Sequence, residues 1–106
     1  MNNVLQEIEL ILESYMLTTD DIKCLLIDIE IKDDVILKLK IPINDKEQRL
    51  KTLQQMSNLT YDDGYGSQKL FGTVWLNNGT WLERAEYDGG EWWELKELPN
   101  IPKELQ

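Results

Sequence analysis

The amino-acid sequence predicts one α+β domain over residues 1–106, with the element order α-β-β-α-β-β-β and two helices packed on one face of a mostly antiparallel sheet. Three observations predict this class. Apolar residues recur every three or four positions in two segments, and they alternate with polar residues in two others. Over residues 60–98, the turn signals Asn78-Gly79 and Gly89-Gly90 separate three short aromatic segments, which is the pattern of a β-meander.

A first helix is expected from about residue 4 to residue 16. Glutamates stand between its apolar residues, as in an amphipathic helix; the apolar residues are Val4, Leu5, Ile8, Ile11, Leu12, Tyr15 and Met16. Asn3 and Gln6 resemble a capping box. The helix should end before Thr18-Thr19-Asp20-Asp21, because these side chains compete for backbone hydrogen bonds.

Two half-buried strands should follow at residues 22–31 and 35–43, where aliphatic residues alternate with polar ones. A three-residue loop between them sets a register in which the opposed pairs are Ile31 with Val35, Ile29 with Leu37, and Asp28 with Lys38. This register places the aliphatic side chains on one face and the charged pair on the solvent side, so both faces of the hairpin are satisfied.

A second helix is expected to begin after Asp45, a good N-cap residue, and to end near Asn58. The apolar positions that recur along it are Leu50, Leu53 and Met56. The loop that follows contains Asp62-Asp63-Gly64-Tyr65-Gly66, but its spacing does not fit a calcium-binding EF-hand. When the glycine of that motif is aligned on Gly64, apolar or aromatic residues stand where carboxylates are required.

The meander is expected to consist of residues 69–76, 80–87 and 91–98, with Pro99 and Pro102 ending regular pairing. Two-residue turns would pair Leu76 with Trp81, Trp75 with Leu82, Gly72 with Ala85, Tyr87 with Trp92, and Glu86 with Trp93. One face would then carry Leu70, Gly72, Val74, Leu76, Trp81, Glu83, Ala85, Tyr87, Trp92, Glu94 and Lys96. The other would carry Phe71, Thr73, Trp75, Leu82, Arg84, Glu86, Trp93 and Leu95.

In this register, both faces of the meander carry tryptophans, so aromatic surface is either exposed or covered by the loop at residues 61–68. Arg84 is expected between Trp75 and Trp93 and paired with Glu86. It would be a structural cation stacked on the indole rings, with a ligand-binding arginine as the alternative.

Acidic residues outnumber basic ones by 20 to 11, which gives a formal net charge of −9. The excess lies toward the two ends of the chain, and residues 1–21 contain no Lys or Arg. Such a field repels phosphate backbones, so nucleic acid is disfavoured as a partner and a basic protein surface is favoured. The alternative interpretation is that the acidic residues serve solubility alone.

Cys24 is the only cysteine, so no intramolecular disulfide can form, and a reducing compartment is expected. No apolar run approaches the roughly 18 residues of a membrane-spanning helix. The first residues also carry acids where a signal peptide has basic residues. These features predict a cytoplasmic protein with no membrane partner.

The sequence lacks the usual groups of an active site. It contains no histidine, the commonest general base and metal ligand, and no Ser, Cys or Lys has a recognisable catalytic partner. Glu83 and Glu94 could imitate the carboxylate pair of a glycosidase, but a domain this small has little room for a sugar-binding cleft. We expect no enzyme activity, no metal and no cofactor.

Four motifs occur together between Asp62 and Trp93: Asp-Gly-Tyr-Gly, Phe-Gly-Thr-Val-Trp, Gly-Thr-Trp, and Tyr-Asp-Gly-Gly-Glu-Trp-Trp. This block, about a third of the chain, resembles a module of small accessory proteins of tailed bacteriophages. The resemblance does not extend to residues 1–60 and implies no catalytic residues. It implies a phage or prophage origin, and hence action inside a bacterial host.

The function expected from these features is that of a non-catalytic phage protein that occludes a basic surface of a host protein. An anti-CRISPR-like inhibitor of a nucleic-acid-processing effector would fit. The candidate contact residues are Asp62, Asp63, Tyr65, Trp81, Glu83, Arg84, Glu86, Tyr87, Glu91, Trp92 and Glu94. The alternatives are a phage structural or assembly protein that forms a homodimer, and a nucleotide or signal-molecule sponge with Arg84 and the tryptophans as its pocket.

Overall fold

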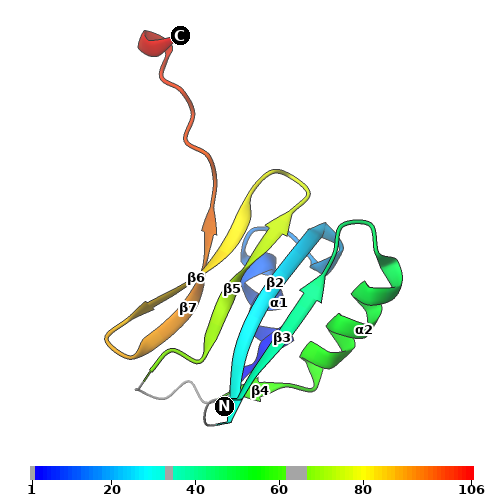
Figure 1. Cartoon of the computed structure of the whole chain (residues 1–106). Coiled ribbons are helices and arrows are strands. Elements are labelled where there is room, and N and C mark those ends of the chain that lie inside the picture. Colours follow the sequence, from blue (N-terminus) through cyan, green and yellow to red (C-terminus); the bar gives the residue numbers. More distant parts are fainter. Residues whose placement is uncertain (1, 33–34, 62–66) are drawn as a thin grey trace.

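The computed structural model describes residues 2–32, 35–61 and 67–106 and confirms the predicted class and element order (Figure 1). The helices are α1 (Val4–Ser14) and α2 (Lys46–Ser57). The five-stranded antiparallel sheet has the order β3-β2-β5-β6-β7, with bounds β2 (Ile22–Lys32), β3 (Val35–Ile41), β5 (Leu70–Leu76), β6 (Trp81–Tyr87) and β7 (Gly90–Lys96). A small second sheet joins β1 (Asn2–Asn3) to β4 (Thr60–Tyr61), and single 3-10 turns lie at Thr19–Asp21 and Lys103–Leu105.

Helix α1 begins where its capping residue predicts. The Asn3 side chain accepts a hydrogen bond from the Gln6 backbone N–H at 2.9 Å, which satisfies one of the free donors of the first turn. The helix buries Val4, Ile8 and Leu12 against the sheet. Its apolar stripe, rather than helix propensity alone, therefore holds it in place.

The β2–β3 hairpin confirms two of the three predicted pairs. Ile29 pairs with Leu37 and Asp28 with Lys38, but Val35 pairs with Lys32, so the predicted pair of Ile31 with Val35 is wrong. A bulge between Glu30 and Lys32 adds one residue on the β2 side. Ile31 and Val35 are both about half exposed, so no buried face enforces the register at this end of the hairpin.

Helix α2 packs on β3 and α1. Asp45 caps it, accepting from the Gln48 N–H at 2.9 Å. Of the three apolar positions that indicated the helix, Met56 is buried, Leu53 packs against the core and Leu50 is 71% exposed. Thr52, one turn before Met56, is buried as well. The Thr52 hydroxyl donates to the Lys40 carbonyl at 2.6 Å, which allows a polar residue to occupy the buried position.

The turn between β5 and β6 is one residue longer than predicted. The Gly79 N–H donates to the Leu76 carbonyl, and the Leu76 N–H donates to the Thr80 carbonyl, so residues 77–79 form the loop. Gly79 has φ +87°, as in a turn that ends in a glycine bulge. Trp75 consequently pairs with Trp81, not with Leu82.

The turn between β6 and β7 lies one residue earlier than predicted. Tyr87 pairs with Gly90, and the two loop residues Asp88 and Gly89 both have positive φ, as a type I′ turn requires. The predicted pairs of Tyr87 with Trp92 and Glu86 with Trp93 are therefore wrong. The shift is by two positions, so the residues of β6 and β7 keep the faces that the sequence predicted.

The slip of one position in β5 changes the composition of both faces. Leu70, Val74 and Leu76 join the core, whereas the prediction placed them with Trp81 and Trp92; Phe71, Thr73 and Trp75 lie on the face that carries these tryptophans. A one-residue slip moves every side chain of a strand to the other face. The predicted faces of β5 are thus exchanged.

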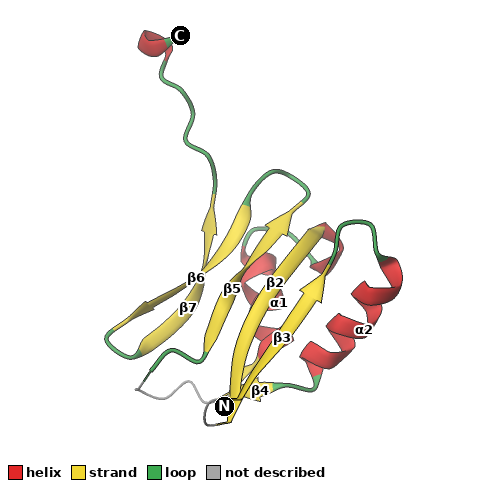
Figure 2. Cartoon of the chain, in the orientation of Figure 1, coloured by secondary structure: helices red, strands yellow, loops and turns green. Residues whose placement is uncertain are grey.

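Both helices lie on one side of the sheet and enclose the core between them and the strands (Figure 2). The sheet contributes aliphatic residues from β2, β3, β5 and β6 and the ring of Trp93 from β7. In the described part of the chain, no helix lies over the opposite side of the sheet. After β7 the chain leaves the domain as an extended arm, residues 97–106 (Figure 1).

Candidate interaction surface on the uncovered face of the sheet

We call the side of the five-stranded sheet that faces away from the helices the open face. Among its apolar side chains, Leu26 is 43% exposed, Phe71 49%, Trp75 41% and Trp92 40%. The cross-strand register places Trp75 between Cys24 and Trp81, Leu26 beside Thr73, and Trp92 beside Ala85. Several exposed aromatic side chains on one uncovered sheet face are typical of a protein-binding site.

Two tryptophan-glutamate units stand side by side on this face. The Trp81 indole N–H donates to Glu83 at 2.7 Å, and the Trp92 indole N–H donates to Glu94 at 3.0 Å. Glu83 lies directly opposite Glu94 in the β6–β7 ladder, so the local two-fold axis of the antiparallel pair relates the two units. We call these four residues the paired Trp-Glu site.

The paired Trp-Glu site places two like charges opposite each other. Such pairs destabilise a ladder unless a cation lies near them. Lys96 supplies one, with its ammonium 3.0 Å from Glu94. The hydrogen bond from Lys96 and then that from Trp92 lower the pKa of Glu94, while Glu94 raises the pKa of Lys96. No positive residue is paired with Glu83 among the described ion pairs.

Charge is divided across the open face. At the β3 side, Lys38 and Lys40 point to this face, and Lys38 lies 3.3 Å from Asp28. At the β6–β7 side, the two carboxylates Glu83 and Glu94 face one cation, Lys96, so the balance there is negative. Acidic character is therefore concentrated on the meander half of the face, beside the indole rings.

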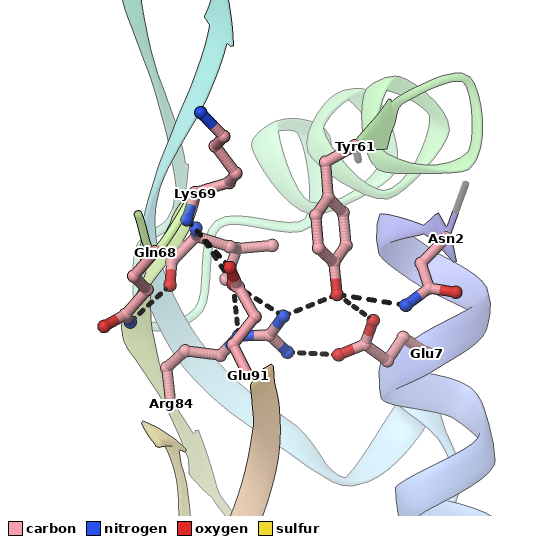
Figure 3. Close-up of polar contacts among 8 residues, drawn as sticks. Asn2, Glu7, Tyr61, Gln68, Lys69, Arg84 and Glu91 are labelled. Atoms are coloured by element: carbon pink, nitrogen blue, oxygen red, sulfur yellow. Dashed lines mark hydrogen bonds and ion pairs between the residues drawn. The ribbon is translucent and has the colours of Figure 1, made fainter. Parts of the chain in front are cut away.

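On the helix side of the sheet, Arg84 lies inside a polar network (Figure 3). Its guanidinium donates to Glu7 of α1, to Tyr61 of β4 and, at 2.8 Å from Nη2 and 3.1 Å from Nε, to Glu91 of β7. It stacks 5.3 Å from the ring centroids of both Tyr61 and Trp93. Only 1% of its side chain is exposed.

The predicted structural role of Arg84 agrees with this geometry, but most of its predicted neighbours are wrong. Trp93 does stack on it, whereas Trp75 lies on the opposite face and Glu86 takes no part in the described contacts. Burial opposes the positive charge, but the hydrogen bonds to Glu7 and Glu91 outweigh burial and raise the pKa of Arg84.

Glu91 extends the network to the start of β5. Its carboxylate accepts from the backbone N–H of Lys69 at 2.8 Å and of Leu70 at 3.1 Å, and 4% of its side chain is exposed. These bonds satisfy two donors at the point where β5 separates from β6. Glu91 thus links β7 to the backbone at the start of β5, and its carboxylate is buried.

Tyr61 is expected to make stability fall at alkaline pH. Burial, and then its hydrogen bond to Glu7, raise its pKa from 10.0 to about 12. Between pH 10 and 12 the unfolded chain loses the Tyr61 proton more readily than the folded chain, so the free energy of unfolding falls as the pH rises. Chemical unfolding across this window should show a shallower fall in stability for Tyr61→Phe than for the unaltered chain; equal slopes would contradict the assignment.

The structure brings five of the predicted contact residues together on the open face: Trp81, Glu83, Tyr87, Trp92 and Glu94. Glu86 is exposed on the other side of β6. Arg84 and Glu91 are enclosed in the network, so neither is available at the surface, and the sheet separates Arg84 from the tryptophans of the open face. Asp62, Asp63 and Tyr65 lie outside the described residues.

Sequence reasoning missed Leu26, Phe71 and Trp75 as companions of the paired Trp-Glu site. The signal that could have found Phe71 and Trp75 is the Asn78-Gly79 pair, which is compatible with a three-residue loop as well as a two-residue one. For Leu26 the signal is the alternation over residues 22–31, which places it with Asp28 on the solvent side. It also missed Glu7 as the partner of Arg84. The signal there is position, because Glu7 follows Val4 by three residues and so lies near the buried stripe of α1.

A groove of about 440 Å³ runs between α1 and the edge strand β7. Leu10, Ile11 and Ser14 line one side and the Trp92-Trp93 pair the other. Two carboxylates, Glu7 and Glu91, also line it, but both are already bound to Arg84.

Across residues 2–32, 35–61 and 67–106, no group of three or more His, Cys, Asp or Glu side chains is placed to bind a metal ion. Within the same ranges, no helix is both long and apolar enough to cross a membrane. Comparison of the chain with known family models, curated proteins and solved structures finds no match.

Proposed function

We propose that this chain is a non-catalytic binding protein that occludes a basic surface of a host protein through the meander half of its open face. The observation that carries the proposal is the paired Trp-Glu site: two indole rings and two opposed carboxylates, all on the uncovered side of one hairpin. Aromatic residues are the usual anchors of protein interfaces, and carboxylates beside them select Arg or Lys on the partner.

The geometry suits a guanidinium or ammonium group of the partner better than an anion. Each carboxylate uses one oxygen to accept an indole N–H, which holds the side chain in place before binding. The second oxygen of Glu94 is bound to Lys96, so among the described ion pairs Glu83 is the carboxylate of this site that pairs with no cation. Trp81 and Trp92 stand two residues before Glu83 and Glu94 on their strands, so the two indoles flank the carboxylates, and indole rings are good partners of cations. Phe71 and Trp75 extend the apolar area toward β5.

The overall charge of −9 would accelerate association with a basic partner, because long-range attraction steers encounter. The phage resemblance adds the setting, a bacterial cytoplasm in which basic surfaces belong largely to nucleic-acid-processing proteins. An anti-CRISPR-like inhibitor of a defence effector, acting by occlusion of its nucleic-acid channel, is the form of the function that we propose.

Reversing the two carboxylates tests the proposal. The tagged chain first captures its partner from a bacterial host lysate at low and high salt, and the purified partner is then titrated by calorimetry. Glu83→Lys with Glu94→Lys should weaken binding by about a hundredfold or more and reduce its salt dependence, because positive charge at this site would then repel the basic surface of the partner.

The matched control is Glu9→Lys with Glu13→Lys, which makes the same change in net charge on exposed positions of α1. It should slow association slightly and leave the dissociation rate unchanged. Equal losses in the two variants would show that only net charge matters. Unchanged binding by the Glu83 and Glu94 variant would refute the proposed site.

The second candidate is a phage assembly protein that forms a homodimer through the same face. The exposed Leu26, Phe71 and Trp75 favour it, because an exposed apolar sheet face is also what a dimer buries. Under this candidate the acidic ends serve solvation alone. A dimer that persists in Glu83→Lys with Glu94→Lys, with no host protein captured, would favour assembly over occlusion.

A further inference from the structure

The apolar side chains of the arm at residues 97–106 do not pack against the domain. Every residue of the arm is exposed, and it extends away from the end of β7 (Figure 1). Leu98 is 77% exposed, Ile101 64% and Leu105 74%. Three large apolar residues on a ten-residue projection are more than an inert tail requires, and they suggest a partner surface.

The arm has the pattern of a polyproline II ligand. Leu98-Pro99-Asn100-Ile101-Pro102 repeats an apolar residue and a proline at a spacing of three. Polyproline II has three residues per turn, so Leu98 and Ile101 share one side and the two prolines another. Pro102 has φ −58° and ψ 146°, close to that conformation. Segments of this kind bind aromatic-lined grooves, because little backbone entropy remains to be lost.

The open face carries a pocket of the matching kind. Cys24, Ile43 and Trp75 line a predominantly apolar hollow of about 260 Å³, with Lys23 at its side. Ile43 is 55% exposed and Trp75 41%, so the pocket lies open to solvent. Lys23 also places a cation where it can meet the acidic residues of the arm, Glu97 and Glu104. We call this hollow the Trp75 pocket.

The arm leaves the sheet at the end where this pocket lies. Cys24 pairs with Trp75, Trp75 with Trp81, and Trp81 with Lys96, which is the last residue of β7. The arm then extends beyond this end of the sheet (Figure 1). A second copy brought to this end by a two-fold axis could receive the arm and return its own, as a closed dimer requires.

We propose that the arm of one copy docks in the Trp75 pocket of a second copy, so that two chains exchange arms reciprocally. The proposal goes beyond the function proposed above, and it uses the β2–β5 side of the open face, where Trp75 belongs to both proposed surfaces. The arm would occupy the β2–β5 side, while the paired Trp-Glu site on β6–β7 remains available to a basic partner.

Light scattering and sedimentation on the full chain test the exchange. The mass should rise with concentration from the 12.5 kDa of one chain to twice that value. Ending the chain after Lys96 removes the arm, so the shortened chain should have the mass of one chain at every concentration. It should still fold, because every residue of the arm is exposed and the arm contributes nothing to the core. A full chain that stays monomeric throughout would overturn the proposal.

A synthetic peptide of residues 97–106 locates the docking site. Titrated into the truncated chain, it should shift the tryptophan fluorescence, since Trp75 lines the pocket. Ile43→Asp should weaken binding of the peptide at least tenfold, and it keeps all four tryptophans, so the fluorescence signal is retained. A peptide with Pro99→Ala and Pro102→Ala should lose most of its affinity as well, because its unbound state is more disordered.

The matched control is Leu10→Ala, which removes an exposed apolar residue from the groove between α1 and β7. It should leave peptide binding unchanged. Loss of binding in Leu10→Ala, with full binding in Ile43→Asp, would place the arm in that groove and overturn the Trp75 assignment. If a host partner still binds the truncated chain, the proposed function is supported whether or not the arm docks in the Trp75 pocket.

Discussion

Replacing Arg84 by methionine is expected to lower the free energy of unfolding by about 3–5 kcal/mol. The change leaves the carboxylates of Glu7 and Glu91 with no cation between them, and Glu91 is 4% exposed. It also removes the ring contacts to Tyr61 and Trp93. Urea unfolding at neutral pH measures the loss.

Two further variants distinguish the cost of leaving buried carboxylates without a cation from the cost of removing a charged side chain as such. Lys38→Met breaks an exposed ion pair with Asp28 and should cost less than about 1 kcal/mol. Adding Glu7→Gln and Glu91→Gln to the Arg84 variant should restore part of the stability, since an uncharged amide is cheaper to bury and can still accept from the Lys69 N–H. A small loss in Arg84→Met would mean that the network contributes little.

Replacing Gly72 by alanine is expected to destabilise the fold by about 3 kcal/mol. A Cβ atom at this position would lie 2.4 Å from the Leu26 carbonyl oxygen and 2.9 Å from the Ile27 Cα, both of them backbone atoms of β2. Neither can rotate away, so β5 would have to move from its neighbour. The φ of +155° adds strain for any residue with a side chain.

Gly79→Ala is the control that measures the cost of a positive φ alone, without a steric contact of the added methyl group. Gly79 has φ +87°, but no atom of the described residues lies within 4 Å of the position that a methyl group would take, so the cost should be about 1 kcal/mol. Chemical unfolding of both variants gives the difference. If Gly72→Ala were no worse than Gly79→Ala, the close contact between β5 and β2 would not be as the structure describes.

The number and order of the elements follow from local patterns. The apolar stripe of α1, its Asn3 cap and the Asp45 cap of α2 all act within one or two turns of helix. The alternation in β2 and β3 likewise assigns each residue to a face without reference to the rest of the chain. These signals are short in range, so one sequence is enough to interpret them.

The register of β5 is where local interpretation failed. Asn78-Gly79 permits either a two-residue turn or a three-residue loop with a bulge, and the two differ by one position. Only packing against β2 distinguishes them, because it requires Leu70, Val74 and Leu76 to enter the core. That choice also turned Phe71 and Trp75 outward, and so it enlarged the candidate surface.

The partners of Arg84 were equally beyond local reasoning. Glu7 stands 77 residues from it in the chain, and Tyr61 stands 23 residues away. What the sequence alone determined was the class of the fold, the order of its elements and the faces of β6 and β7, because periodicity and caps act over a few residues. The tertiary structure decided which side of the sheet is open and which charges are enclosed, because both depend on contacts between strands and helices that the chain brings together only on folding.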